Sequence, residues 1–164
     1  MKTSTHIMGR RIAGALLIVG LLSGCAGLRP YPNTMGKNLH IQTETDSGSI
    51  FSKVRAAVDI FSVNADCTPE YQGTVKLKAP SIDVGISPNE LSYMVFVFSN
   101  SSFLANSRSS ISHETLLKTR AGYNYDIKVS YIDDIYDVSI EENHQGSSKS
   151  REIELRNLST CQSL

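Results

Sequence analysis

The residues of this sequence that could carry catalytic chemistry are few and widely spaced. Beyond the N-terminal apolar segment the histidines are His40, His113 and His144, and their spacing is not that of metal ligands. His113-Glu114 matches only the start of a His-Glu-x-x-His zinc motif, and there is no Gly-x-Ser-x-Gly, no phosphate-binding glycine loop and no Cys-x-x-Cys. The sequence therefore predicts no catalytic residue, no metal site and no cofactor.

Acidic residues gather in the C-terminal third, where they could attract a cation. The segment from residue 126 to residue 142 holds Asp126, Asp133, Asp134, Asp137, Glu141 and Glu142, against the single cation Lys128. Calcium would need about six to eight oxygen ligands that converge on one point. Alternation instead places Asp137 and Glu141 on the outward face of a strand, so we interpret the acids as a solvated face that discourages aggregation.

Chemistry of another kind is indicated around Cys25. The first 24 residues contain three basic residues and no acid, and residues 12–22 form an uncharged apolar run. A membrane-spanning helix needs about 20 apolar residues, so this shorter run suits the h-region of a secretory signal peptide. The sequence Leu22-Ser23-Gly24-Cys25 that follows resembles the lipobox of bacterial lipoproteins.

The resemblance implies that residues 1–24 are a signal peptide and that Cys25 is lipidated. Several acyl chains on Cys25 would give stable anchoring, since one chain alone is marginal. Ala26 follows the cysteine where aspartate would favour the inner membrane, so the resemblance points to the outer membrane, facing the periplasm. An unmodified Cys25 behind an ordinary signal peptide, or a signal anchor, is the alternative. Residues 25–38 lack apolar periodicity, and we expect a lipidated cysteine followed by a flexible tether.

Removal of the signal peptide would leave Cys67 and Cys161 as the remaining thiols. Because the compartment beyond the inner membrane is oxidising, we expect a disulfide between them, with two unrelated buried thiols as the alternative. The mature chain would hold 13 basic and 16 acidic residues, a formal net charge of −3, without a basic cluster. Nucleic-acid binding is therefore not expected.

From residue 39 onward, apolar and polar residues alternate as they do in half-buried β-strands. Turn residues at 66–69, 79–80 and 87–89 separate alternating segments at 39–43, 54–60, 71–77 and 82–86. Residues 91–98 are apolar on both faces, which predicts a central strand covered on each side. We therefore expect residues 39–164 to form one all-β domain, an antiparallel β-sandwich with a faint likeness to immunoglobulin-like or transthyretin-like envelope domains.

The most definite local prediction is a hairpin over residues 123–140. With Asp133-Asp134 as its turn, Tyr131 falls opposite Tyr136, and the apolar residues of both strands share one face. A slip by one residue would place the two apolar sets on opposite faces, so this register is self-consistent.

Residues 99–113 hold seven serines around Phe103 and Leu104, and their polar composition predicts a loop. Loops on a rigid scaffold often carry binding sites. The candidate partner contacts are therefore Phe103, Leu104 and Arg108, unless the apolar pair packs into the core.

Two classes of function remain open. The first is a non-enzymatic, outer-membrane-anchored envelope component whose β-domain is structural or binds another envelope protein. The second is a periplasmic small-ligand binder or a hydrolase with a site built from scattered residues. The absence of catalytic motifs and the small size favour the first.

The anchor is directly testable. Replacing Cys25 with Ala should abolish fatty-acid labelling and leave the protein unprocessed or soluble, because the thiol is the acylated group. Metabolic labelling with a fatty acid and membrane fractionation measure this. A Cys25→Ala variant that matures normally and fractionates with membranes like the wild type would contradict the lipobox interpretation.

Overall fold

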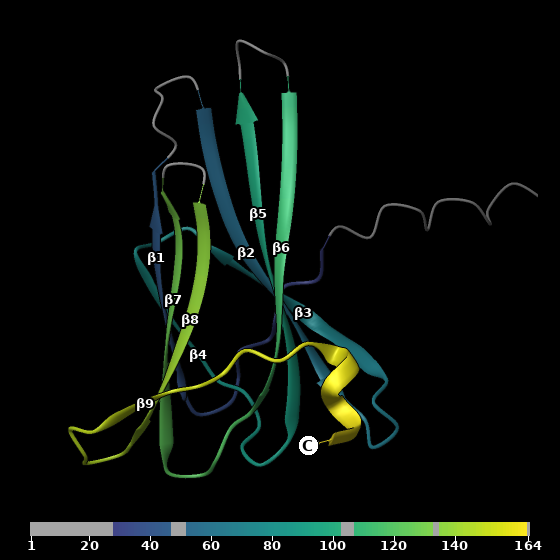
Figure 1. The fold of residues 1–164 in the computed structure, drawn as a ribbon, viewed down its shortest axis with the longest axis vertical. Helices are drawn as coiled ribbons and strands as arrows, with labels where there is room; N and C mark the ends of the chain where they lie inside the picture. Colours follow the sequence, from purple (N-terminus) through teal and green to yellow (C-terminus); the bar gives the residue numbers. More distant parts are fainter. Residues whose placement is uncertain (1–27, 47–51, 103–106, 133–134, 164) are drawn as a thin grey trace, which may run out of the picture.

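The computed structural model describes residues 28–46, 52–102, 107–132 and 135–163, which contain nine β-strands and one short 3₁₀ helix (Figure 1). The strands are β1 (Leu39–Thr45), β2 (Ser52–Val63), β3 (Pro69–Leu77), β4 (Ser81–Val84), β5 (Leu91–Ser102), β6 (Ser107–Lys118), β7 (Tyr123–Ile132), β8 (Ile135–His144) and β9 (Ser150–Glu152). The 3₁₀ helix is η1 (Leu158–Ser163). The strands form two packed sheets, which confirms the predicted all-β sandwich.

The two sheets have different sizes and edges. Sheet A has the order β3-β2-β5-β6, and sheet B has the order β4-β1-β7-β8-β9. Neighbouring strands pair antiparallel except β1 and β7, which pair in parallel from Leu39↔Tyr125 to Thr45↔Tyr131. The predicted antiparallel architecture therefore holds with one parallel pair inside sheet B.

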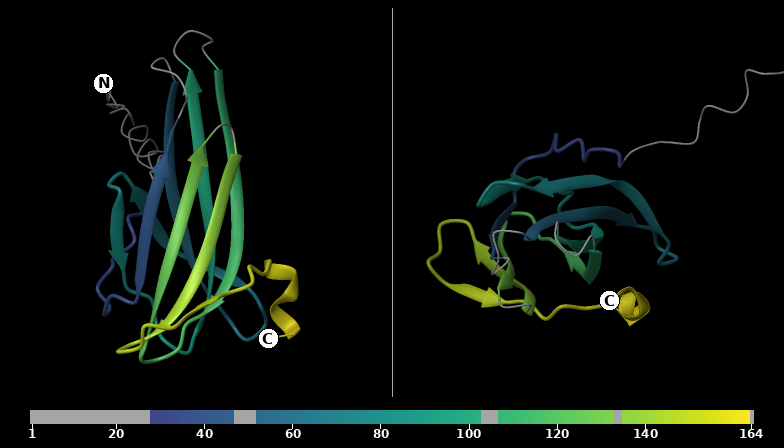
Figure 2. Two further views of the ribbon diagram at one scale, coloured as in Figure 1. Left: turned by 60° about the vertical axis from the view of Figure 1, so that its left-hand side comes forward. Right: turned by 90° about the horizontal axis from the view of Figure 1, so that it is seen from above.

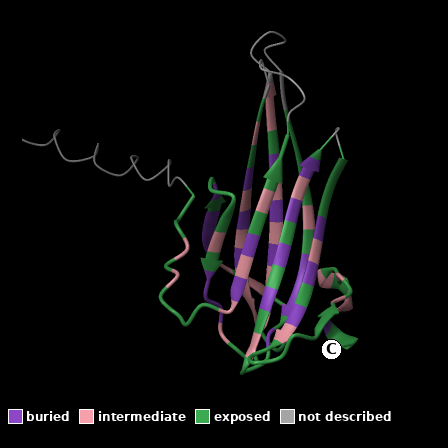
Figure 3. Cartoon of the chain, turned by 90° about the vertical axis from the view of Figure 1, so that its left-hand side faces the viewer, coloured by how far each residue is buried: buried purple, intermediate pink, exposed green. Residues whose placement is uncertain are grey.

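The core lies between the sheets and follows from the alternation in the sequence, since successive side chains of a strand point to opposite faces. Buried and exposed residues alternate along the strands (Figure 3). The largest fully buried side chains are those of Tyr125, Phe96, Phe98, Leu39, Ile41 and Ile60. β5 is an interior strand, but only its inward face is fully buried; the outward residues Tyr93, Val95 and Val97 are half-buried. The predicted cover on both faces is thus incomplete, because no described element forms a further layer over Val95 and Val97.

The predicted hairpin is confirmed. β7 and β8 pair with Ile127 opposite Ile140, Val129 opposite Val138 and Tyr131 opposite Tyr136. The ladder ends with Ile132 opposite Ile135, and Asp133 and Asp134 lie outside the described residues.

The predicted loop over residues 99–113 is wrong. Residues 99–102 continue β5 and residues 107–113 belong to β6, with pairs running without a break from Leu91↔Lys118 to Ser102↔Ser107. The serines do not interrupt the strands because the ladder is made by backbone groups, and β5 also pairs with β2 as far as Ser52. Arg108 therefore stands in β6 opposite Ser101, while Phe103 and Leu104 lie outside the described residues.

The predicted flexible tether is also wrong for its described part, because residues 29–38 are bonded to the body. Pro30 forms a parallel bridge with Thr74 on β3, and the Tyr31 N–H donates to the Thr74 carbonyl at 3.0 Å. A Cβ on Gly73, whose φ is +144°, would lie 2.6 Å from the Cα of Tyr31, so glycine allows this close approach. Residues 28–31, which we call the N-terminal segment, thus lie along the β3 edge of sheet A (Figure 2). Residues 25–27 lie outside the described part.

The predicted disulfide is present. Cys67, in the turn between β2 and β3, is bonded to Cys161 in η1, with 5.9 Å between their Cα atoms. The Leu116 N–H of β6 donates to the Arg156 carbonyl at 2.6 Å, so the C-terminal segment also pairs with the edge of sheet A. A cross-link over a separation of 94 residues removes much unfolded-state entropy, about 4–5 kcal/mol by the loop-closure model. It fixes a C-terminal end that would otherwise fray.

The buried carboxylate of Glu142 on β8 joins side chains from β7, from β9 and from the turn between β6 and β7. The Glu142 side chain is 4% exposed and accepts hydrogen bonds from Arg120, from Arg151 at 2.9 Å and from the Tyr125 hydroxyl at 2.8 Å. Burial by itself would raise the pKa of Glu142, but the hydrogen bonds from Arg120 and Tyr125 and the charges of both arginines lower it overall. The ionised form is therefore the native form.

This lowered pKa predicts an acid-dependent stability. A carboxyl whose folded pKa lies below its unfolded value stabilises the fold above the ordinary carboxyl range and loses that contribution as the pH falls through the folded pKa. Glu142→Gln should lower the free energy of unfolding at neutral pH by about 1.5–3 kcal/mol, and the difference from wild type should shrink in acid. Urea unfolding of both proteins at neutral pH and at an acidic pH below the ordinary carboxyl range measures this difference. Glu152→Gln, at an exposed position on β9, is the control; an equal effect of both substitutions would contradict the assignment.

Candidate functional site

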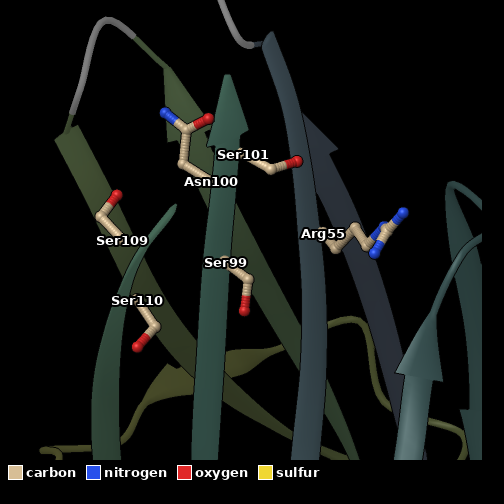
Figure 4. Close-up of a pocket in the computed structure, with 6 residues that line it drawn as sticks. All are labelled: Arg55, Ser99, Asn100, Ser101, Ser109 and Ser110. Carbon is tan, nitrogen blue, oxygen red and sulfur yellow. The ribbon is translucent and has the colours of Figure 1, made fainter. Parts of the chain in front are cut away.

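The strongest candidate site lies where β2, β5 and β6 extend past the core at the upper end of sheet A (Figure 1). A depression of about 470 Å³ is lined there by Arg55, Ser99, Asn100, Ser101, Ser109 and Ser110, and we call it the serine pocket. Its geometry follows from strand register, since Arg55 stands opposite Ser99 and Ser99 stands opposite Ser110. Figure 4 shows Arg55 on β2 beside Ser99 and Ser101 on β5, with Ser109 and Ser110 on β6.

On the inner side of the same strands the two sheets leave an apolar slot of about 220 Å³. Its apolar walls are Val54, Phe98, Ile111, Tyr131 and Tyr136, which come from five strands. The Phe98 ring lies 5.9 Å from the Tyr136 ring, centroid to centroid. Ile111 and Tyr136 are 37% and 36% exposed, so the slot opens between β6 and β8.

Asn100 connects the serine pocket with the apolar slot, because it lines both. Its Nδ2 donates to the Tyr131 hydroxyl at 3.3 Å. Its Oδ1 is buried and accepts no hydrogen bond from any described residue. Buried polar atoms are almost always paired in native proteins, and the Asn100 amide therefore keeps hydrogen-bonding capacity for a group outside the described residues.

The backbone edge of β6 beside these cavities is open. Since the Leu116 N–H points away from β5 to Arg156, alternation directs the N–H groups of Ser110, Ser112 and Glu114 to the same side. No described residue accepts a hydrogen bond from these three groups, and we call residues 108–114 the open edge.

The other sheet edges are protected in the ways that natural proteins use. β4 and β9 have four and three residues. β3 carries the N-terminal segment at Thr74 and a register shift in its pairing with β2. The open edge, in contrast, is part of a regular ladder that lacks a register shift and a proline. It is therefore the long unprotected edge of the described sandwich.

A second depression, of about 580 Å³, lies toward the β3 side of sheet A. It is lined by the exposed cations Lys53, Arg55, Lys76 and Lys78. Leu28 also lines it, and Ala57 and Val97 form its floor. We call it the basic groove. These cations form no ion pair with any described residue, and the carboxylate in the groove is that of Asp59, which accepts a hydrogen bond from the Thr74 hydroxyl.

Sequence reasoning missed the basic groove, because its cations come from two strands. The signal was present as Lys53-x-Arg55 and Lys76-x-Lys78, two pairs at the spacing that places side chains on one face of a strand. The register that sets Lys76 opposite Ala57 brings the pairs together, and a search for contiguous basic runs cannot find them.

The described histidines lie apart from one another, on different strands. His40 pairs with Asp83 at 2.7 Å on sheet B, His144 packs its ring on Tyr123, and His113 stands on β6 opposite Phe96. Among the described residues, no three His, Cys, Asp or Glu side chains are placed to hold a metal ion. The serine pocket offers hydroxyls and one guanidinium, which can form hydrogen bonds and bind an anionic group.

Comparison with protein-family models gave no match, and comparison with curated proteins gave no significant match. Within the described residues, no helix has the length and apolar character required to cross a bilayer.

Proposed function

We propose that this chain is a lipoprotein of the bacterial envelope, anchored through Cys25 in the outer membrane and facing the periplasm, whose sandwich binds another envelope protein. The lipobox-like sequence before Cys25 and Ala26 after it support the anchor. The Cys67–Cys161 disulfide agrees with an oxidising compartment. Binding rather than catalysis is the role that a pocket of hydroxyls and one guanidinium supports.

The observation that carries this proposal is the open edge of β6 beside the apolar slot. In β-strand addition, an extended segment of the partner pairs with exposed backbone groups, and alternate side chains enter pockets. Here Ser110, Ser112 and Glu114 offer the backbone groups. A strand added at this edge would direct every second side chain toward Ile111 and Tyr136, and the buried Asn100 Oδ1 would accept a donor from the partner.

The alternative is a periplasmic small-ligand binder that uses the serine pocket. Its volume of about 470 Å³ lies in the range of small-molecule sites. Arg55 would then hold an anionic group and the serine hydroxyls would orient it. A hydrolase is less well supported, because no serine of the pocket has a histidine or carboxylate among the other lining residues.

Strand addition predicts that one backbone group decides binding. Ser112→Pro removes an N–H that points away from β5, so the β5–β6 ladder stays intact and the free energy of unfolding should change by less than about 1 kcal/mol. Site-specific photo-crosslinking from Ser110 in native envelopes, followed by identification of the crosslinked chain, should give a specific partner band with wild type and lose it with Ser112→Pro.

Ser112→Ala is the matched control, because it removes the hydroxyl and keeps the backbone N–H. It should retain the crosslink. Loss of the crosslink in both variants would mean that the side chain and not the edge makes the contact, and retention in both would contradict strand addition. A crosslink to a second copy of this chain would identify the partner as the protein itself.

A further inference from the structure

We propose that the basic groove lies against anionic phospholipid headgroups of the membrane that holds the chain. The inference rests on the proposed lipid anchor at Cys25 and goes beyond it, because it assigns one face of the sandwich to the bilayer. Three observations support it: the charge of the groove, the path of the N-terminal segment and the charge of the opposite sheet.

The basic side chains of the groove are exposed to solvent. Lys53, Arg55, Lys76 and Lys78 are exposed and form no ion pair with a described carboxylate, and they outnumber Asp59, the one acid in the lining. Each Lys or Arg held near an anionic bilayer strengthens association about fivefold. The half-buried Val97 and Ala57 on the groove floor add apolar area of the kind that borders headgroups.

The path of the chain holds this groove close to the anchor. Leu28 lines the groove, and the next residues are fixed on β3 by the Thr74 N–H donating to the Arg29 carbonyl at 2.8 Å and the Tyr31 N–H donating to the Thr74 carbonyl at 3.0 Å. The Tyr31 hydroxyl also donates to the Gly85 carbonyl at 2.9 Å. Because Leu28 follows Cys25 by three positions, an extended chain between them spans about 11 Å at most. That length is close to the Debye length of about 8–10 Å in physiological salt.

The outer face of sheet B has the opposite charge. Its cation Lys128 pairs with Glu44 at 3.7 Å, and exposed acids on β1, β4, β7 and β8 outnumber it: Glu44, Asp83, Asp126, Asp137 and Glu141. An anionic surface attracts the face of sheet A and repels that of sheet B, so the lipid-anchored domain has one preferred orientation. β3 and β6 are opposite edges of sheet A, so this orientation keeps the open edge away from the N-terminal anchor.

The test uses the lipidated protein, reconstituted in vesicles of phosphatidylcholine alone or of phosphatidylcholine mixed with phosphatidylglycerol. Since the chain contains no tryptophan, Ser99→Trp in the groove and Ser139→Trp on the outer face of sheet B serve as matched reporters. Brominated lipids should quench the Ser99→Trp fluorescence in anionic vesicles and leave the Ser139→Trp fluorescence unquenched. High salt should remove the difference, since the Debye length falls to about 3 Å at 1 M.

Charge reversal supplies the decisive comparison. Lys53→Glu with Arg55→Glu should shift the ratio of groove-bound to unbound orientations at least about 25-fold and reduce quenching to the level of the sheet B reporter. Lys118→Glu with Lys149→Glu changes the total charge equally outside the groove and should leave quenching unchanged.

Two failures are distinguishable. If mass spectrometry finds no lipid on Cys25, the proposed anchor fails before the groove is tested. If Cys25 is lipidated and the Ser99→Trp quenching is the same in neutral and anionic vesicles, the membrane-facing groove is overturned. Equal loss in both charge-reversed variants would also overturn it.

Discussion

The edge of a β-sheet presents backbone N–H and C=O groups without partners, and a sandwich must cover, shorten or use each of its edges. In this protein the segments before β1 and after β9 cover parts of the β3 and β6 edges. The N-terminal segment pairs with β3 at Thr74, and the C-terminal segment pairs with β6 at Leu116, where the Cys67–Cys161 disulfide holds η1 in place. Sheet B ends in strands of four and three residues. The open edge, residues 108–114 of β6, has no such protection from any described residue, and we propose that a partner strand pairs there, beside the apolar slot.

The same arrangement places the two proposed contacts, with membrane and with partner, on different parts of sheet A. The N-terminal segment that covers β3 also fixes Leu28 beside four unpaired cations, so the edge nearest the proposed anchor is the positively charged one. The open edge stands on the other side of sheet A, and the acidic outer face of sheet B discourages contact with anionic lipid. Membrane contact is therefore proposed for the outer face of sheet A toward β3, and partner contact for the β6 edge of the same sheet.

Where the sequence predicts correctly, the cause is local. Alternation from Leu39 to Ile140 defines most strands, and the matching apolar faces of residues 123–131 and 136–140 leave one sensible register. The Cys67–Cys161 pair followed from the oxidising compartment and the lipidation of Cys25 that the lipobox-like sequence led us to expect, since these leave two thiols to pair. In contrast, residues 99–113 look like a loop because serine is a turn residue, yet their backbone continues a ladder begun by Met94 and Phe96. The pairing of β5 with β2 and β6 determined the structure of this stretch, although its composition predicted a loop.

The candidate site could be predicted only in part. Arg108 and the serines of the site lie within the stretch that the sequence singled out, but their role depends on β6 being an edge, which only topology determines. Likewise, Pro30 and Pro32 resemble a spacer, and nothing in the local sequence shows that Gly73 provides room for Tyr31. The basic groove requires the register between β2 and β3. Such features depend on residues distant in sequence, so local patterns do not contain them.

Residue-resolved amide hydrogen exchange along β6 in the isolated protein tests most directly whether this edge is open. Because alternate N–H groups point toward β5, the amides of Ile111 and His113 should exchange slowly and those of Ser110, Ser112 and Glu114 rapidly. The Leu116 amide, which donates to Arg156, should mark the end of the rapid set. Slow exchange at Ser110, Ser112 and Glu114 in the isolated protein would show that the edge is already covered and would contradict the account.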